Sequence, residues 1–392
     1  MTTSGASGDG RTSLGELAWL FLRLGTTAFG GPAAHIALME DEVVRRRQWM
    51  TRERFLDLLG ATNLIPGPNS TEMAIHIGHA RRGAGGLIVA GVCFIVPAAL
   101  IVSAIAWVYV RYGTLPAVTG VLYGVKPVII AVVVQALWGL GKSAAKDRWL
   151  AALGVAALAA CLAGVHELVV LGVAGAMSAT LSRIKARRAA GAASVVIWPW
   201  PLLAGSATTT AAGAAAFGLW PLFLIFLKIG SVLFGSGYVL LAFLRADLVD
   251  RLHWLDPSQL LDAVAVGQVT PGPVFTTATF IGYLLGGPAG AATATVGIFL
   301  PAFVFVAVSG PLIPRIRRSP TAGAVLDGVN IASLALMLAV AIQLGRSAIV
   351  DIPTTLLAAA SAALLIRYRV SSAWLVLAGA IVGAVVTWRP FS

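Results

Sequence analysis

Long apolar stretches separated by short basic loops dominate the hydropathy pattern of this chain. Most of the stretches approach the roughly 20 residues that an α-helix needs to cross a bilayer. Backbone groups in lipid must be hydrogen-bonded within their own segment, so we expect these stretches to be helices. They run from Ala84 to Tyr109, Leu115 to Leu140, Leu150 to Val165, Leu168 to Ile184, Gly218 to Leu244, Ala289 to Leu312, Ala322 to Leu344, Ile349 to Ile366 and Ala373 to Trp388. The pattern predicts an all-α, polytopic integral membrane protein.

The composition agrees with a membrane location. Hydrophobic residues make up 58% of the chain and charged residues 11%, and the mean hydropathy is +0.88. The net charge of +12 resides in short loops between apolar stretches, as in cytoplasmic loops of membrane proteins. We therefore expect a lipid bilayer as the surroundings and no nucleic-acid partner. Residues 1–13 are polar, lack the features of a signal peptide and are predicted to be a disordered tail.

The sequence contains an internal repeat. The run FLRLGTTAFGG from Phe21 returns as FLKIGSVLFGS from Phe226, 205 residues later. The same separation relates Pro66-Gly67-Pro68 to Pro271-Gly272-Pro273, and a separation of 204 then relates Pro97 to Pro301. Agreement over so many positions indicates a duplication. The predicted domains are a first membrane repeat at 14–183, a linker at 184–217 and a second membrane repeat at 218–392.

Loop charges indicate how the two repeats are oriented. Arginines precede and follow the first Pro-Gly-Pro segment, whereas the matching flanks of the second are nearly neutral. If positive loops are cytoplasmic, the segment from Phe55 to Gly78 is a re-entrant hairpin. About ten transmembrane helices and two re-entrant or broken hairpins then form an inverted repeat, with both termini outside. Whether 201–217 is a further crossing stays open.

Two pairs of Gly/Pro-rich breaks occupy corresponding places in the repeats. Transporters with inverted repeats bind their cargo where such discontinuous helices leave backbone groups free. A Pro-Gly-Pro ends one half-helix, and the next begins just beyond it with an N-terminus that attracts anions. A purely structural kink is the alternative. The break residues that are candidates for the site are Gly30, Gly31, Pro66, Gly67, Pro68, Gly235, Gly237, Pro271, Gly272 and Pro273, and the polar residues beside them are Asn63, Asn69, Ser70, Thr71, Gln268 and Thr276.

Charged residues within the apolar segments are functional candidates because intramembrane charge is costly. Arg23 and its repeat mate Lys228 precede the first break of each half, and two such cations would suit a doubly charged anion. Snorkelling to an interface is the alternative. Lys126 is a further candidate, although its mate is the neutral Asn330. Glu72 could pair with Arg23 or Lys126, or carry a coupled proton, and pairing is the role we expect.

The histidines and cysteines give no sign of a metal site. His35 follows the first break and is either a donor to an anion or a hydrogen-bonded packing residue. His76 and His79 could share a helix face, but no carboxylate or thiol cluster completes a ligand set. Cys93 and Cys161 read as small buried hydrophobes. We expect neither metal nor cofactor.

These motifs resemble the chromate ion transporter family in its long, two-domain form. The resemblance rests on FLRLGTTAFGGPAAHI, the duplicated Pro-Gly-Pro, the Pro97 segment and Gly124-Val125-Lys126-Pro127, and it spans residues 17–344. It implies two homologous membrane domains and chromate efflux across the bacterial plasma membrane, with sulfate as an analogue. It also makes functional candidates of Arg23, Gly30, Gly31, His35, Pro66, Gly67, Pro68 and Lys126.

The alternatives to this function belong to three classes. An intramembrane enzyme is not expected, because the chain lacks HExxH, GxSxG and any cluster of intramembrane acids and histidines. An ion-coupled transporter of sulfate or another inorganic anion is the main alternative, and a passive anion channel is the third. The sequence leaves homodimer formation open.

Overall fold

The computed structural model describes residues 12–29, 31–113, 115–144, 146–189, 217–233, 239–309, 319–368, 370 and 372–387. These residues form fourteen α-helices and no strand, so the predicted all-α class is confirmed. The predicted linker lies mostly outside the described residues, as does the question of a crossing at 201–217.

The helices repeat in the same order in the two halves. The first half holds α1 (Leu14–Thr27), α2 (Gly31–Glu40), the π-helical segment η1 (Asp41–Arg46), α3 (Arg52–Thr62), α4 (Asn69–Tyr112), α5 (Pro116–Ala144), α6 (Arg148–Leu162) and α7 (Glu167–Ala189). The second holds α8 (Leu219–Val232), α9 (Leu240–Leu244), the π-helical segment η2 (Arg245–Arg251), α10 (Pro257–Val269), the 3-10 segment η3 (Val274–Thr276), α11 (Thr277–Ser309), α13 (Pro320–Ala348), α14 (Ile352–Tyr368) and α15 (Ser372–Thr387). α1 and α8 have the same length, and their boundaries are 205 residues apart.

A sharp turn divides α4 and α11 into two arms each. Arg82 leaves the helical conformation and Gly83 has a φ of +58°, and Gly286 and Gly287 repeat this in α11. The arms pack closely because glycines face each other. A Cβ on Gly78 would lie 2.2 Å from the carbonyl oxygen of Gly86. The 44 residues of α4 are therefore a short arm folded against a long one.

Each half begins with two broken hairpins that enter from the same end. The Arg81 guanidinium donates to the Thr12 hydroxyl at 2.8 Å and to the Trp49 carbonyl at 2.7 Å. These bonds hold together the start of α1, the loop before α3 and the turn in α4. The path through α1, α2 and η1 thus returns to the end where it began, and α3 with the short arm of α4 does the same. The sequence predicted the second hairpin, and the structure adds the first.

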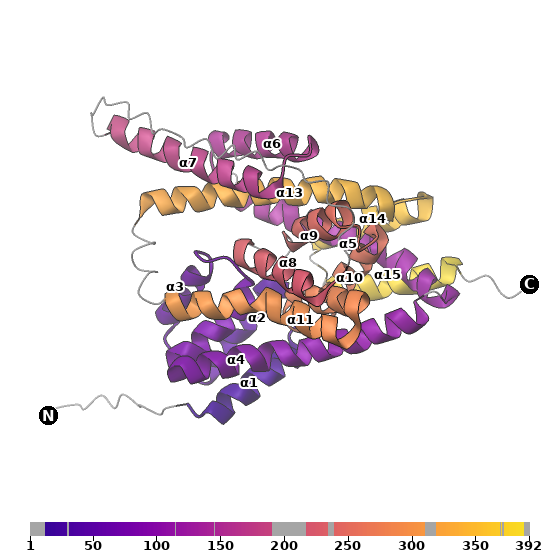
Figure 1. The fold of residues 1–392 in the computed structure, drawn as a ribbon, viewed down its shortest axis with the longest axis horizontal. Coiled ribbons are helices and arrows are strands. Elements are labelled where there is room, and N and C mark those ends of the chain that lie inside the picture. The colour runs from indigo at the N-terminus through magenta and orange to yellow at the C-terminus, as the bar shows by residue number, and fades with distance from the viewer. Residues whose placement is uncertain are drawn as a thin grey trace, which may run out of the picture.

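Equivalent helices of the two halves run in opposite directions. In Figure 1, α4 ends and α5 begins on the right, whereas α11 ends and α13 begins on the left. This orientation is that of an inverted repeat. α1 begins on the left and α15 ends on the right, so the expectation that both termini lie on one side is wrong. The physical reason is that the first apolar segment turns back at Gly31 and does not cross.

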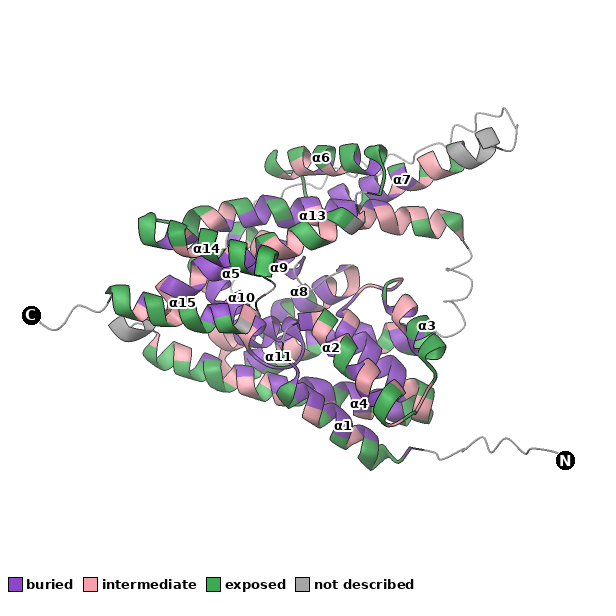
Figure 2. Ribbon diagram, turned by 180° about the vertical axis from the view of Figure 1, so that it is seen from behind, coloured by how far each residue is buried: buried purple, intermediate pink, exposed green. Residues whose placement is uncertain are grey.

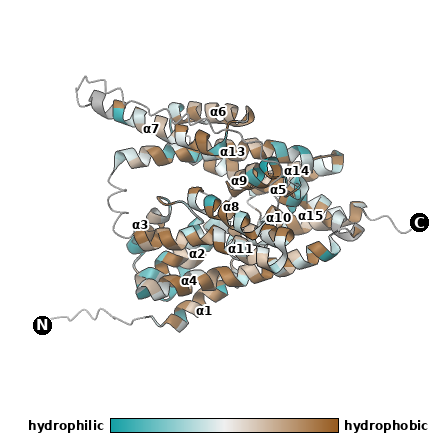
Figure 3. Ribbon diagram, in the orientation of Figure 1, coloured by the Kyte–Doolittle hydropathy of each residue, from teal (hydrophilic) through white to brown (hydrophobic). Residues whose placement is uncertain are grey.

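The outer surface of the helices is apolar. Within the described ranges, five helices are long and apolar enough to cross a membrane by length and composition, namely α4, α5, α7, α11 with η3, and α13. Figures 2 and 3 show exposed residues and hydrophobic residues together along the outer helices. Trp107, Trp138, Trp220 and Trp374 are among the large side chains exposed there. Such a surface suits lipid contact.

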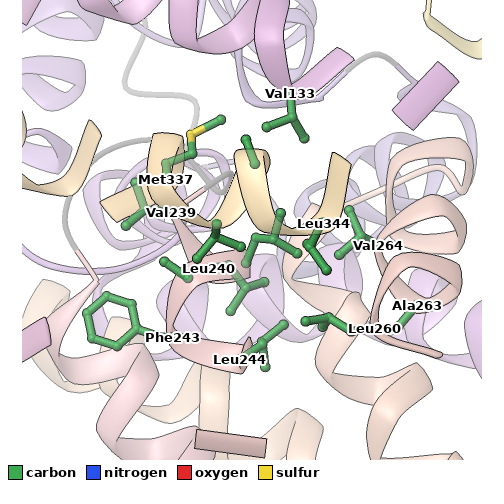
Figure 4. Packing of buried hydrophobic residues seen from close by; sticks show 14 of the residues in the cluster. Val133, Val239, Leu240, Phe243, Leu244, Leu260, Ala263, Val264, Met337 and Leu344 are labelled. Carbon is green, nitrogen blue, oxygen red and sulfur yellow. The ribbon is translucent and has the colours of Figure 1, made fainter. Parts of the chain in front are cut away.

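The core lies where the broken segments of the second half meet the long helices. Leu240 and Leu244 of α9 pack with Leu260 of α10 and with Met337 and Leu344 of α13 (Figure 4). All of these side chains are buried. The broken segments α9 and α10 of the second half are thus packed against α13.

Candidate functional site

Two hydrogen bonds between the halves define the centre of the molecule. The Gly67 amide donates to the Leu233 carbonyl at 2.8 Å, and the Gly272 amide donates to the Ala28 carbonyl at 2.9 Å. Ala28 and Leu233 are the residues at which α1 and α8 end. Each Pro-Gly-Pro tip therefore reaches into the helix break of the opposite half. We call these two tips, 66–68 and 271–273, the crossed tips.

Glycine is required at both tips by backbone conformation and by space. Gly67 has a φ of +142° and Gly272 a φ of +87°, which L-residues with side chains rarely adopt. A Cβ on Gly272 would lie 2.5 Å from the Cβ of Ala98 and 3.0 Å from the Gly25 carbonyl oxygen. The proline on each side prevents a continuous helix. Packing between the tips and α1 and α4 thus explains these glycines without a ligand.

Helices begin at the crossed tips with their N-termini towards the centre. α4 starts directly after Pro68, which provides no side-chain cap. The Asn69 side-chain amide donates to the side-chain oxygen Oδ1 of Asn63 at 2.9 Å and links the two sides of the tip. Ser70 and Thr71 in the first turn are buried, and the Thr71 hydroxyl has no hydrogen-bond partner among the described residues. Unpaired first-turn amides and the helix dipole favour an anion here.

The second tip is more self-contained. The Thr276 hydroxyl donates to the Pro273 carbonyl at 2.8 Å, and the Thr277 hydroxyl donates to the Val274 carbonyl at 2.9 Å. Gln268 and Thr277 line a small cavity whose other walls are apolar side chains of α5, α9, α10 and η3. The two tips therefore differ chemically although their backbones are related by the repeat.

Arg23 and Lys228 form equivalent ion-pair clusters. Arg23 contacts Glu42 at 2.5 Å, and Lys228 contacts Asp247. Both acids are buried and lie on the π-helical segments η1 and η2. Lys228 also lies 3.7 Å from Glu167 of α7. The expected meeting of the two cations at one cargo is not seen among their contacts, because each is held by an acid.

Further arginines join the acid in each half. Arg47 lies 3.3 Å and Arg46 3.4 Å from Glu42, and Arg251 lies 2.8 Å from Asp247. The repeat thus relates whole ion-pair clusters to one another. The main role of the cations in each cluster is to neutralise a buried acid.

Lys126 joins a different network. Its ammonium lies 3.3 Å from Asp262 of α10, and the Tyr109 hydroxyl donates to the same carboxylate at 2.8 Å. This network ties α4 and α5 of the first half to α10 of the second. Asn330 lies on α13, at the place that the repeat assigns to Lys126.

Glu72 is isolated from the other charges. It is fully buried in the first turn of α4, and neither carboxyl oxygen has a hydrogen-bond partner among the described residues. A Cβ on Gly67 would lie 2.3 Å from Oε1 of Glu72, so the carboxyl group rests against the tip glycine. The expected pairing of Glu72 with Arg23 or Lys126 is wrong, because those cations bind Glu42 and Asp262.

His35 bonds to the first helix break. Its Nε2 donates to the Ala28 carbonyl at 3.0 Å, the same carbonyl that accepts from Gly272, and its ring meets Phe94 edge-on at 5.8 Å. Of the two roles considered, these contacts fit the hydrogen-bonded packing residue. Gly31 has a φ of +78°, as the break requires. Gly30, Gly235 and Gly237 lie outside the described residues.

The partners of the intramembrane cations were not among the candidates predicted from the sequence. Glu42, Asp247 and Glu167 hold Arg23 and Lys228, and Asp262 and Tyr109 hold Lys126. A signal for the first pair was present, because the repeat aligns Glu42 with Asp247 and Arg46 with Arg251. Acids and bases kept together at matched positions indicate an ion-pair cluster.

Comparison with known proteins places the chain in a family. The family described as Chromate transporter matches residues 15–179 and again residues 220–384, one match per repeat. The chromate transport protein of Cupriavidus metallidurans is 34% identical over 375 residues, covering 94% of this chain and 92% of that protein. That of Pseudomonas aeruginosa is 32% identical over 346 residues, covering 85% and 82%.

An archaeal relative extends the comparison. An uncharacterized transporter of Methanocaldococcus jannaschii is 26% identical over 338 residues, covering 82% of each chain. No solved structure matches the chain significantly. The duplicated match, the extent of the identities and the all-helical inverted repeat agree with one another, and this chain belongs to the chromate transporter family.

Proposed function

We propose that this protein exports chromate from the cytoplasm through the plasma membrane of a bacterial cell. Family membership over both repeats supports a transporter, and the names of the relatives in Cupriavidus and Pseudomonas support chromate as the cargo. The observation that carries the proposal is the pair of reciprocal hydrogen bonds between the halves. The Gly67 amide donates to the Leu233 carbonyl, and the Gly272 amide donates to the Ala28 carbonyl. This pair of bonds creates one shared centre with helix N-termini directed at it.

In this proposal the dianion binds between the crossed tips. Chromate has four oxygens that accept hydrogen bonds, and the first turns of α4 and of η3–α11 supply backbone amides. The Thr71 hydroxyl, which has no hydrogen-bond partner among the described residues, adds a donor on the first tip. Sulfate has the same charge and the same tetrahedral shape, so it should compete for the site. Arg23 and Lys228 act at a distance, because their first partners are Glu42 and Asp247.

The inverted repeat supplies a route for alternating access. The broken hairpins of the first half enter from one end and those of the second half from the other. Rocking of one repeat against the other would open the shared centre to each end in turn. Such a carrier moves an anion without a continuous pore.

Counterflow in proteoliposomes tests the function. Vesicles loaded with unlabelled chromate should take up labelled external chromate transiently above equilibrium, and excess external sulfate should slow the uptake. Gly139→Ala, at a position where nothing lies within 4 Å of the added methyl group, should transport normally and serves as the matched control. Counterflow of sulfate, molybdate or phosphate without any of chromate would assign a different cargo. Conductive flux without counterflow would indicate a channel.

A further inference from the structure

Glu72 is placed in a way that pairing does not explain. The fully buried side chain lies within a helix that is apolar enough to cross a membrane, and its oxygens have no hydrogen-bond partner in the described part of the chain. An unpaired charge at such a place costs several kcal/mol even after relaxation. A carboxylic acid carries no charge and avoids this cost.

Among the described residues, no cation of the surrounding elements forms an ion pair with Glu72. α1, α2, α3, α10, η3 and α11 pack against α4, and η3 and α11 contain no charged residue. Arg23 is bonded to Glu42, and Asp262 to Lys126 and Tyr109. On α4 itself the nearest titratable group is His76, one turn away, whose Nε2 also has no hydrogen-bond partner among the described residues. The titratable and charged side chains on the packed elements are Glu16 and Arg23 on α1, His35 and Glu40 on α2, Arg52, Glu53, Arg54 and Asp57 on α3, Asp262 on α10, and Tyr283 on α11.

The position of Glu72 links it to the cargo centre. Its carboxyl group lies against Gly67, and the Gly67 amide donates a hydrogen bond to the Leu233 carbonyl at the end of α8. It also belongs to the first turn of α4, the turn whose amides face the centre. In the second half the repeat places Thr276 here, and that hydroxyl is satisfied by the Pro273 carbonyl. In the described part of the second half, the tip therefore has no counterpart of the Glu72 carboxyl group.

We infer that Glu72 is a proton-binding site that couples anion binding to the uptake of one proton. This inference rests on the proposed function, since it concerns the same crossed tips. As a carboxylic acid, Glu72 can donate a hydrogen bond to an oxyanion, whereas the carboxylate repels it. The complex of one dianion and one proton then carries one negative charge fewer than the anion alone. Loss of the proton on either side of the membrane weakens anion binding there and favours release.

The pH dependence of chromate affinity tests this site. Affinity is measured on purified protein in alkaline solution, where chromate itself stays fully dianionic. Wild-type affinity should fall by up to tenfold per pH unit once Glu72 is ionised, because binding must then take up a proton. Glu72→Gln, which is neutral at every pH, should bind with an affinity that no longer falls. Glu72→Asp and the control His76→Gln should keep the wild-type slope.

The outcomes are distinguishable from those of the proposed function. A Glu72→Gln protein that keeps the wild-type slope would overturn the inference while chromate binding stands. If that variant does not fold, infrared spectra of wild-type protein at neutral pH should still show a carboxylic acid carbonyl band that shifts in Glu72→Asp. The absence of such a band overturns the inference. A wild-type protein that does not bind chromate would overturn the proposed function instead, and the infrared band would still report on the proton.

Discussion

The Gly67 amide donates a hydrogen bond to the carbonyl of Leu233 over 2.8 Å, across the boundary between the two repeats. Its repeat mate, Gly272 to Ala28, is formed at 2.9 Å. A helix that ends within a membrane leaves carbonyl groups without partners, which is costly in lipid. Each half satisfies one such carbonyl of the other half. Neither repeat alone contains a complete centre, which gives the duplication a structural reason.

The inverted arrangement makes a prediction about topology. Gln48 lies in the loop before α3, and Ser319 precedes α13 at the same end of the molecule. Ile352, at the start of α14, lies at the other end and is exposed. In intact cells a membrane-impermeant thiol reagent should label Ile352→Cys rapidly and Gln48→Cys and Ser319→Cys only after permeabilisation. Rapid labelling of just one of the latter two sites would contradict the inverted repeat.

The glycine contacts in the hairpins predict a difference in stability. Gly78→Ala and Gly282→Ala each place a methyl group within about 2.3 Å of a backbone carbonyl oxygen, at 2.2 Å and 2.3 Å respectively. Backbone cannot move aside cheaply, so we expect both variants to lose several degrees in Tm or to fail to accumulate. Gly139→Ala meets nothing within 4 Å and should be as stable as wild type or slightly more so. Thermal unfolding in detergent measures this, and equal Tm values for all three would rule out the close hairpin.

Much of this architecture could be predicted because glycine and proline mark it. The positions of the crossed tips and the pairing of segments between halves follow from Pro66, Gly67 and their mates. The direction in which the chain leaves the first break could not be predicted, because Gly31 permits either a crossing or a return. That choice depends on tertiary contacts such as the bonds of Arg81 to Thr12 and Trp49.

The candidate site was predicted less completely. Cations within apolar segments were recognised as costly, but Glu42 is 19 residues from Arg23 and no local pattern joins them. The isolation of Glu72 is likewise a property of the packed structure. Nothing in the sequence shows that Lys126 forms an ion pair with Asp262.

The ion-pair cluster of the first half predicts energetic coupling. Arg23→Gln removes the closest partner of the buried Glu42 and should lower Tm, although Arg47 at 3.3 Å and Arg46 at 3.4 Å remain. Adding Glu42→Gln should restore part of that loss, since contacting residues in such clusters couple by about 0.5–3 kcal/mol. A double-mutant cycle on Tm measures the effect. Two results together would contradict this role and place Arg23 in the cargo site. The Tm losses of the two single variants would add strictly in the double variant, and chromate affinity would be lost in both proteins that carry Arg23→Gln.

The two tip threonines predict unequal effects on affinity. Thr71→Val removes a buried hydroxyl that has no hydrogen-bond partner among the described residues and should weaken chromate binding by about tenfold, equivalent to about 1.4 kcal/mol. Thr276→Val removes a hydroxyl already bonded to Pro273 and should change affinity much less. Titration calorimetry with chromate compares them. Equal affinities for Thr71→Val and wild type would remove that hydroxyl from the site.

The location of the bound chromate tests the account most directly. Chromium scatters anomalously, so crystals of the protein soaked in chromate can reveal the anion without assumptions about its contacts. We expect an anomalous difference peak between 66–68 and 271–273, within hydrogen-bond reach of the first-turn amides of α4. Sulfate in excess should abolish the peak. A peak beside Arg23 and Glu42 or beside Lys228 and Asp247, with none at the crossed tips, would contradict the account.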